Sequence, residues 1–194
     1  MHLATASAEA LLAERTLTSL SSHFLITEQV IGTHPTGKRL RIDAILRPRD
    51  PSPWSRSDIA LGVEFKAPTD RPSERRERKE NCKIISQCID YSLVDWSAFG
   101  QVPIFFCPGF AEIRAASDRE NDPFFSDQDY AEGFRNGIGY LMAGVMGQNN
   151  VGELAHSQHL GWAFLINGHH RIWSQKYGLG EGARNKLIRQ VGSR

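Results

Sequence analysis

The sequence lacks several features that would assign a protein to a class at once. No uninterrupted apolar run approaches the roughly 18 residues that a membrane-spanning helix needs. The first residues show neither the basic start nor the apolar block of a secretory signal, so we expect a cytoplasmic location and no membrane partner. Basic residues exceed acidic residues by only one, 23 against 22, so a nucleic-acid surface would require local clustering of charge.

Cysteine is scarce as well. The three thiols of Cys82, Cys88 and Cys107 are odd in number and show no zinc-type pairing, so we expect buried, reduced side chains. Hydrophobic residues make up 40% of the chain and charged residues 23%, which are ordinary proportions for a globular fold. The length of 194 residues suits one domain with a sizeable core.

Two glycine-containing stretches have part of the pattern of a nucleotide-binding loop. Residues 32–38 have the glycine and lysine spacing of a P-loop, but Arg39 stands where that loop needs Ser or Thr. Strand-like alternation then follows instead of a helix, so residues 35–37 are interpreted as a hairpin turn. Residues 178–182 lack the full spacing of a dinucleotide fingerprint, and we discard that interpretation.

The stretch at residues 61–68 organises the rest of the chain. Val63 and Phe65 alternate with Glu64 and Lys66, so a strand places the carboxylate and the ammonium side by side on one face. Such a pair is either a surface ion pair, which contributes little, or part of a metal-dependent hydrolytic site. In such a site the carboxylate holds a hard cation, and the ammonium orients water or meets developing charge.

Hydrophobic periodicity predicts three elements before this strand. Residues 6–22 have leucines at helical spacing, and residues 23–32 alternate as a strand does. Residues 38–46 predict a second strand, which carries Asp43 between two apolar residues. Because strands are depleted in aspartate, Asp43 is a candidate functional residue.

After the strand, the pattern predicts a helix and another strand. Residues 70–80 are densely charged, and the helix that follows is expected to extend to Trp96. Gln87 and Tyr91 lie four residues apart, so they share one ridge of this helix. Residues 102–107 form a short apolar run that predicts a buried strand.

The C-terminal part carries weaker patterns. An apolar stripe from Tyr130 to Val145 predicts a helix, and Asn167-Gly168 between two apolar runs predicts a β-hairpin. His169 and His170 would point to opposite faces of a strand, so they are interpreted as turn-side residues and not as ligands of one metal.

The predicted order is helix, three strands, helix, strand, with Asp43, Glu64-x-Lys66 and Gln87-xxx-Tyr91 on successive elements. This constellation resembles the PD-(D/E)XK nuclease superfamily, and its helix resembles that of RecB-like nucleases and lambda exonuclease. Ile42 stands where the name-giving pattern has proline, a position that is loose in the superfamily. The resemblance covers about residues 6–107.

The resemblance implies an α/β fold of the restriction-endonuclease-like kind. Its αβββαβ core has a mixed central sheet flanked by helices, and we expect residues 1–194 to form a single domain of this type. About residues 108–194 would then be an extension that contains the C-terminal helix and the β-hairpin.

The resemblance also implies a Mg²⁺-dependent deoxyribonuclease, with Mn²⁺ as a substitute cofactor and DNA as the partner. Asp43, Glu64 and the backbone carbonyl of Phe65 are the expected metal ligands, and Lys66 is the catalytic cation. Gln87 and Tyr91 are expected to fix the lysine or to contact the phosphate backbone. Many members add an N-terminal acidic residue, for which the sequence does not choose among Glu9, Glu14 and Glu28. The basic residues expected to hold further phosphates are Arg75, Arg76, Arg78, Lys79 and Lys83.

Two other interpretations stay open. In the first, the chain is a catalytically inactive nuclease-fold module that binds nucleic acid or a protein partner. In the second, it is a structural protein with a solvated, charged sheet face, and Asp43 is then expected to lie far from Glu64. The sequence identifies no surface for a homo-oligomer and does not distinguish endonuclease from exonuclease activity.

Overall fold

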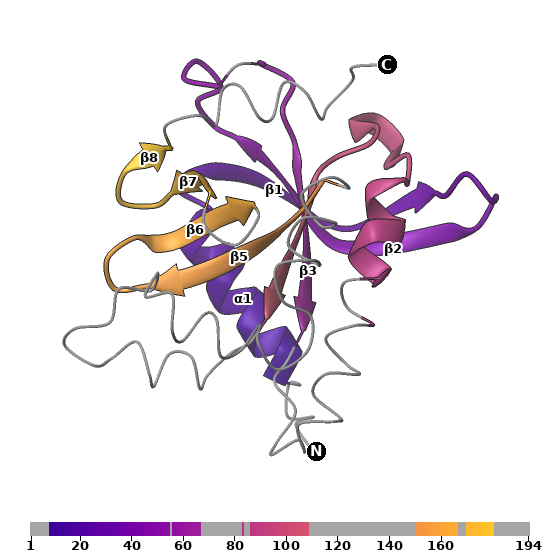
Figure 1. Cartoon of the computed structure of the whole chain (residues 1–194), viewed down its shortest axis with the longest axis horizontal. Coiled ribbons are helices and arrows are strands. Elements are labelled where there is room, and N and C mark those ends of the chain that lie inside the picture. The colour runs from indigo at the N-terminus through magenta and orange to yellow at the C-terminus, as the bar shows by residue number, and fades with distance from the viewer. Residues whose placement is uncertain are drawn as a thin grey trace, which may run out of the picture.

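The computed structural model describes residues 8–54, 56–66, 83, 86–108, 150–166 and 170–180. Within these ranges an eight-stranded mixed sheet and one long helix form an α/β architecture (Figure 1). The predicted helix between Tyr130 and Val145, the Asn167-Gly168 turn and His169 lie outside the described residues. No helix in the described part of the chain is both long and apolar enough to cross a membrane.

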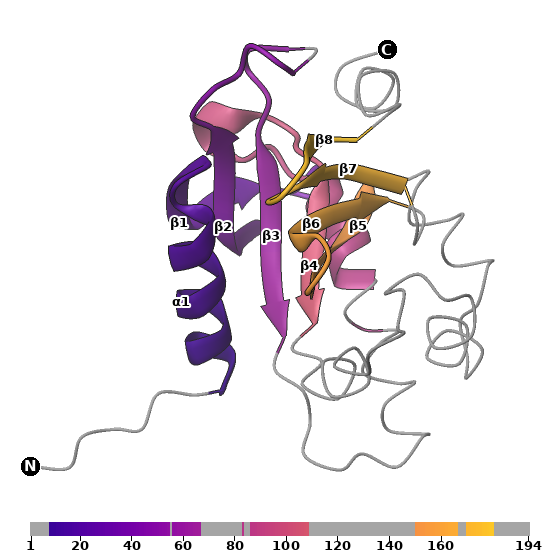
Figure 2. The same ribbon diagram turned by 90° about the vertical axis from the view of Figure 1, so that its left-hand side faces the viewer.

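Helix α1 (Ala8–Leu20) confirms the first predicted helix and covers one face of the sheet (Figure 2). Its buried leucines, Leu17 and Leu20, pack in one core cluster with Phe24, Val63 and Phe65. Apolar residues at helical spacing therefore bury a stripe against the strands and leave the charged face of the helix exposed.

Strands β1 (Phe24–Thr33) and β2 (Arg39–Pro48) form an antiparallel hairpin. Its turn holds Gly37 at a φ of 83°, a left-handed conformation that glycine adopts without steric cost. The predicted hairpin turn is confirmed, and the P-loop alternative is excluded because a strand follows. Strand β3 (Leu61–Lys66) pairs antiparallel with β2 and parallel with β4 (Ile104–Pro108).

A second core cluster lies on the other face of these strands. Residues 86–92 are helical, and Cys88 and Tyr91 pack there with Ile42 and Ile104. The predicted helix ends at Ser92, so its predicted extension to Trp96 is wrong. The chain leaves the helix because Asp95 pairs with Thr33 of β1 in an isolated bridge, an extended conformation that a helix cannot provide. Trp96 is buried nonetheless, and its ring nitrogen donates to the carbonyl of Tyr91.

The sheet continues through four strands beyond β4, so it is larger than the expected six-element core. Strand β5 (Val151–Ser157) pairs parallel with β4, and β6 (Gly161–Ile166), β7 (His170–Ser174) and β8 (Gly178–Leu179) follow in antiparallel order. The predicted hairpin is confirmed as β6 and β7, but it belongs to the main sheet. Leu154, Phe164 and Trp173 share the core cluster beneath α1.

Candidate active site

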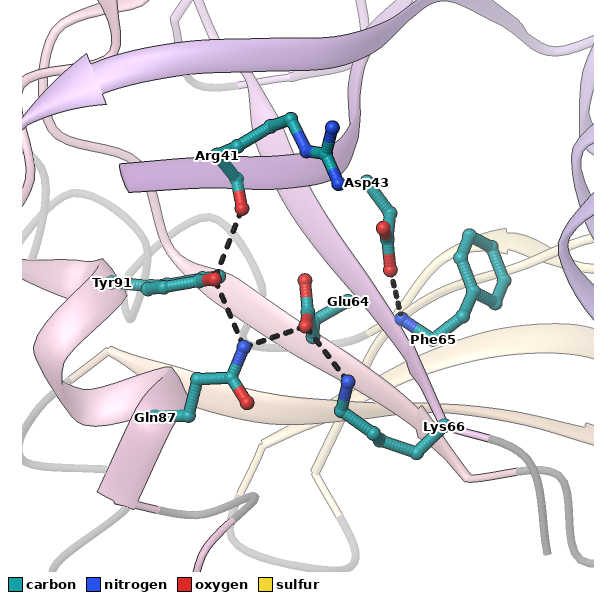
Figure 3. Close-up of polar contacts among 7 residues, drawn as sticks. All are labelled: Arg41, Asp43, Glu64, Phe65, Lys66, Gln87 and Tyr91. Atoms are coloured by element: carbon teal, nitrogen blue, oxygen red, sulfur yellow. Dashed lines mark hydrogen bonds and ion pairs between the residues drawn. The ribbon is translucent and has the colours of Figure 1, made fainter. Parts of the chain in front are cut away.

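The site lies where β2 and β3 separate. Their pairing ends at Ala44 and Val63, immediately before Asp43 and Glu64. Asp43 Oδ2 accepts a hydrogen bond of 2.8 Å from the backbone N–H of Phe65 (Figure 3). Because strand N–H groups lie in the plane of the sheet, the Asp43 carboxylate occupies the gap between the two strands.

The backbone of the hairpin is irregular at the same level. Gln29 of β1, which would stand opposite Asp43, has a φ of 54°, and no pair joins these two residues. In a regular strand Ile42 and Ala44 would face the same side of the sheet, but Ile42 belongs to one core cluster and Ala44 to the other. Simple alternation along β2 therefore fails at Asp43, which turns this side chain toward β3.

Glu64 lies on the face of β3 that residues 86–92 cover, and only 4% of the residue is exposed. Its Oε1 accepts a hydrogen bond of 2.7 Å from Gln87 Nε2 and pairs with Lys66 Nζ at 3.1 Å. Its Oε2 is buried and has no hydrogen-bond partner in the described structure. The interpretation of Glu64 and Lys66 as a surface ion pair is therefore wrong for the carboxylate.

The electrostatics of the pair follow from this burial. Loss of solvation raises the pKa of Glu64 to about 7, the nearby Asp43 charge adds to the effect, and Lys66 opposes it. Burial alone would lower the pKa of Lys66, but the charge of Glu64 and their hydrogen bond outweigh it and raise that pKa. Near neutral pH, the lysine is thus charged while the carboxyl group is close to its titration point.

Gln87 and Tyr91 share a ridge, as predicted, and connect β3 to β2. Gln87 Nε2 also lies 2.9 Å from Tyr91 Oη, and the tyrosine hydroxyl donates to the carbonyl of Arg41 at 3.0 Å. Figure 3 shows this chain of contacts from β2 across the helix to Glu64. Gln87 therefore bonds the carboxylate, and it reaches Lys66 only through that carboxylate.

The three alternatives for the N-terminal acidic residue all line one cleft between α1 and the β1–β2 hairpin. The cleft has a volume of about 650 Å³ and also contains Asp43. The charge of Glu9 contributes to the raised pKa values of Glu64 and Lys66, whereas Glu14 and Glu28 are not among the charges that shift them. Among the three alternatives that the sequence left open, Glu9 is thus the one whose charge acts on Glu64 and Lys66.

The donor set limits what the site can hold. Within the described ranges, no group of three His, Cys, Asp or Glu side chains is close enough to hold a metal ion. Asp43 and Glu64 offer hard carboxylate oxygens, and Mg²⁺ needs only one or two carboxylates because it keeps several waters. The buried, unpartnered Oε2 of Glu64 fits such an ion. The Phe65 carbonyl as a further ligand stays a prediction.

The structure describes only one of the predicted phosphate-binding residues. Lys83 is exposed, whereas Arg75, Arg76, Arg78 and Lys79 lie outside the described residues. Of the three thiols, Cys88 and Cys107 are buried and form no disulfide, as expected, and Cys82 lies outside the described residues. Comparisons of the chain with protein-family models, curated proteins and solved structures find no match, so the interpretation of the site rests on its residues and their geometry.

Proposed function

We propose that this chain is a Mg²⁺-dependent nuclease of the PD-(D/E)XK type that hydrolyses phosphodiester bonds of DNA. The observation that carries the proposal is the state of Glu64. One carboxylate oxygen is held by Gln87 and Lys66, and the other is buried without a partner beside the Asp43 charge. Burying an unpaired carboxylate oxygen costs free energy, which a bound cation would offset.

In this proposal Asp43 and Glu64 would hold the cation, and Glu9 adds negative charge to the site without being a ligand. When bound, the cation polarises the scissile phosphate and lowers the pKa of a coordinated water. Lys66 Nζ, beside Glu64, orients the attacking water or stabilises the negative charge that develops on the phosphate. Gln87 holds Glu64 Oε1 in place, so the carboxylate presents its other oxygen to the ion.

Cleavage of linear and plasmid DNA with Mg²⁺ or Mn²⁺ tests the proposal. Wild type should cut, EDTA should abolish cutting, and Lys66→Ala should lower the rate by at least about tenfold because a charge that meets the transition state is removed. Lys176→Ala is a matched control, since that lysine lies in the turn between β7 and β8 and bonds the backbone of Gln158. Full activity of Lys66→Ala would overturn the assigned roles.

A second candidate is a module of the same fold that binds nucleic acid without turnover. The ion pair between Lys66 Nζ and Glu64 Oε1 favours it, because this pair partly balances the carboxylate charge without a cation. Under this alternative DNA binds equally well in EDTA, and neither cation produces cleavage of any DNA form. Metal-dependent cutting that Asp43→Asn removes would exclude it.

A further inference from the structure

The β1–β2 hairpin extends past the rest of the sheet. Its pairing runs from Val30 and Ile42 to Thr33 and Arg39, whereas pairing between β2 and β3 has already stopped at Ala44. Residues 30–42 therefore form a two-stranded arm, which reaches outward beside the helix of residues 86–92 (Figure 1).

One face of the arm is fixed to the body of the protein. Ile42 belongs to the core cluster that contains Val94 and Trp96, and Leu40, which is partly buried, packs against that cluster. Thr33 and Asp95 exchange backbone hydrogen bonds of 2.9 and 3.0 Å. At Gly32, an added Cβ would lie only 2.6 Å from the carbonyl oxygen of Asp95, so the two backbones are in close contact. The arm is thus held rigidly although only two strands form it.

The other face of the arm is exposed and cationic. Arg39 and Arg41 alternate with Leu40 and Ile42 and are both exposed, as is Lys38 in the turn. No described residue forms a hydrogen bond or ion pair with the guanidinium of either arginine. Arg41 lines the cleft together with Asp43, and Tyr91 anchors its backbone carbonyl.

The cleft is also lined by acidic residues. These are Glu9 and Glu14 on α1 and Glu28 on β1. Their carboxylates would repel a polyanion, whereas the arginines of the arm would attract it, so approach along the arm is the electrostatically favoured route to Asp43. The acidic lining also means that a phosphate can stay near Asp43 only while cations on the arm, or at the site, offset the repulsion.

The spacing on the arm suits a phosphate backbone. Arg39 and Arg41 are two residues apart on β2, so their side chains leave one face of the arm about 6.6 Å apart. Neighbouring phosphates of one DNA strand lie further apart than the rise of about 3.4 Å along the helix axis, because the backbone winds around that axis, so the two arginines can contact neighbouring phosphates. Asp43, two residues beyond Arg41, departs from this alternation and turns toward β3 where the arm begins.

We propose that the exposed face of the arm binds the phosphodiester backbone of DNA through Arg39 and Arg41 and directs it toward Asp43. This inference rests on the proposed nuclease function, for which it names a binding surface distinct from the predicted basic residues at positions 75–83. The arm supplies affinity without sequence readout, because contacts to phosphates carry no base information.

Binding of a fluorescent duplex DNA to the full chain in EDTA tests the arm without cleavage. Anisotropy is measured between about 50 and 200 mM salt, where counterion release makes log K fall linearly with log salt. Arg39→Ala and Arg41→Ala should each reduce the magnitude of this slope by about 0.9, the value expected when one arginine no longer neutralises a phosphate. Arg15→Ala is the control, because Arg15 is exposed on α1 but does not line the cleft.

The outcomes separate the two proposals. A reduced slope in both arm variants, with Arg15→Ala equal to wild type, supports the arm even when no cation produces cleavage. Cleavage by wild type together with unchanged slopes in the arm variants overturns the arm and leaves the nuclease proposal standing. Equal reductions in the arm variants and in Arg15→Ala, or no binding of DNA by wild type at the lowest salt, also overturn the arm.

Discussion

Gln87 and Lys66 both bind the same oxygen of Glu64, at 2.7 and 3.1 Å, and leave the other oxygen without a partner. Both interactions favour the charged form of the carboxylate, yet burial still raises the pKa of Glu64 to about 7. Among the described residues, the charge of Glu64 is therefore only partly balanced by Gln87 and Lys66.

Gln87→Ala is expected to lower DNA cleavage by about 10- to 100-fold, the usual cost of removing a residue that orients a metal ligand. Without its hydrogen bond the pKa of Glu64 rises further, so the acid limb of the pH–rate profile should move to higher pH. Tyr91→Phe keeps the ring packing and the bond from Gln87 to Glu64, and it removes the bonds of the tyrosine hydroxyl to Gln87 and to the Arg41 carbonyl, so its effect should be smaller.

The shift of the acid limb separates positioning from simple loss of structure. Gln101→Ala is the matched control, since the Gln101 amide bonds the carbonyl of Leu93. A Gln87→Ala enzyme with wild-type rate and an unmoved pH profile would contradict the role assigned to Gln87.

Stability in the absence of a cation should depend on Glu64 and pH. The pKa of Glu64 is about 7 in the folded chain against 4.5 as its ordinary value, so the folded state disfavours the charged form. The resulting destabilisation of the folded state is absent below about pH 4.5, grows as the pH rises and reaches its full size above about pH 7. Its size is on the order of 3–4 kcal/mol, from 1.36 kcal/mol per pKa unit.

Glu64→Gln removes this titration while retaining most of the volume and the packing of the side chain. Urea unfolding in EDTA should show the variant gaining stability relative to wild type between about pH 5 and pH 8. If the free energy of unfolding depends on pH in the same way in both proteins, the pKa of Glu64 is not raised by burial in the folded state. Glu14→Gln, an exposed acid on α1, is the control for removal of one negative charge.

Local patterns in the sequence predict the elements that carry the site. Alternation around Glu64 and Lys66 places both side chains on one face of β3, and the four-residue spacing of Gln87 and Tyr91 places both on one ridge, as their hydrogen bonds confirm. Each prediction depends only on the period of a strand or helix. Membership of the PD-(D/E)XK superfamily is not decided by element order and stays a proposal.

The features that the sequence does not predict depend on contacts between distant segments. Strand β5 is buried along almost its whole length, so it lacks the alternation that marks a half-buried strand. The burial of Glu64 requires the helix that covers its face, and an alternating pattern alone indicates a solvated side. The Asp43 side chain turns into the gap between the strands at the level where Gln29 has a left-handed backbone conformation. No pattern of residues in the sequence predicts that conformation.

Phe164→Ala should destabilise the whole sheet by about 3–5 kcal/mol, the usual cost of removing a fully buried phenylalanine. Phe164 is 0% exposed and its ring lies 4.8 Å from that of Phe105 and 5.7 Å from that of Phe24. Because these rings come from β6, β4 and β1, unfolding should remain a single transition by circular dichroism and by tryptophan fluorescence.

Tyr177→Ala is the control, since 53% of Tyr177 is exposed, and its cost should stay below about 1 kcal/mol. Two separate transitions, with Phe164→Ala shifting only one of them, would show that residues 150–180 fold apart from the strands that carry Asp43 and Glu64.

Mg²⁺ or Mn²⁺ should raise the melting temperature of wild type, because a ligand that binds only the folded state stabilises it by RT ln(1 + [L]/Kd). At one hundred times Kd the gain is about 2.7 kcal/mol. Asp43→Asn and Glu64→Gln should abolish the shift, and Glu9→Gln should reduce it, whereas Glu28→Gln should leave it at the wild-type value.

The pH dependence of this shift distinguishes binding at Glu64 from binding elsewhere on an acidic surface. A cation there must displace the proton of a carboxyl group whose pKa is about 7, so the apparent affinity should fall as pH drops below that value. Exposed acids titrate near their ordinary values and would bind the ion equally well at about pH 6. A change in melting temperature that is independent of pH in this range and persists in Glu64→Gln would place the cation away from Asp43 and Glu64. It would remove the basis for metal-dependent hydrolysis by this site.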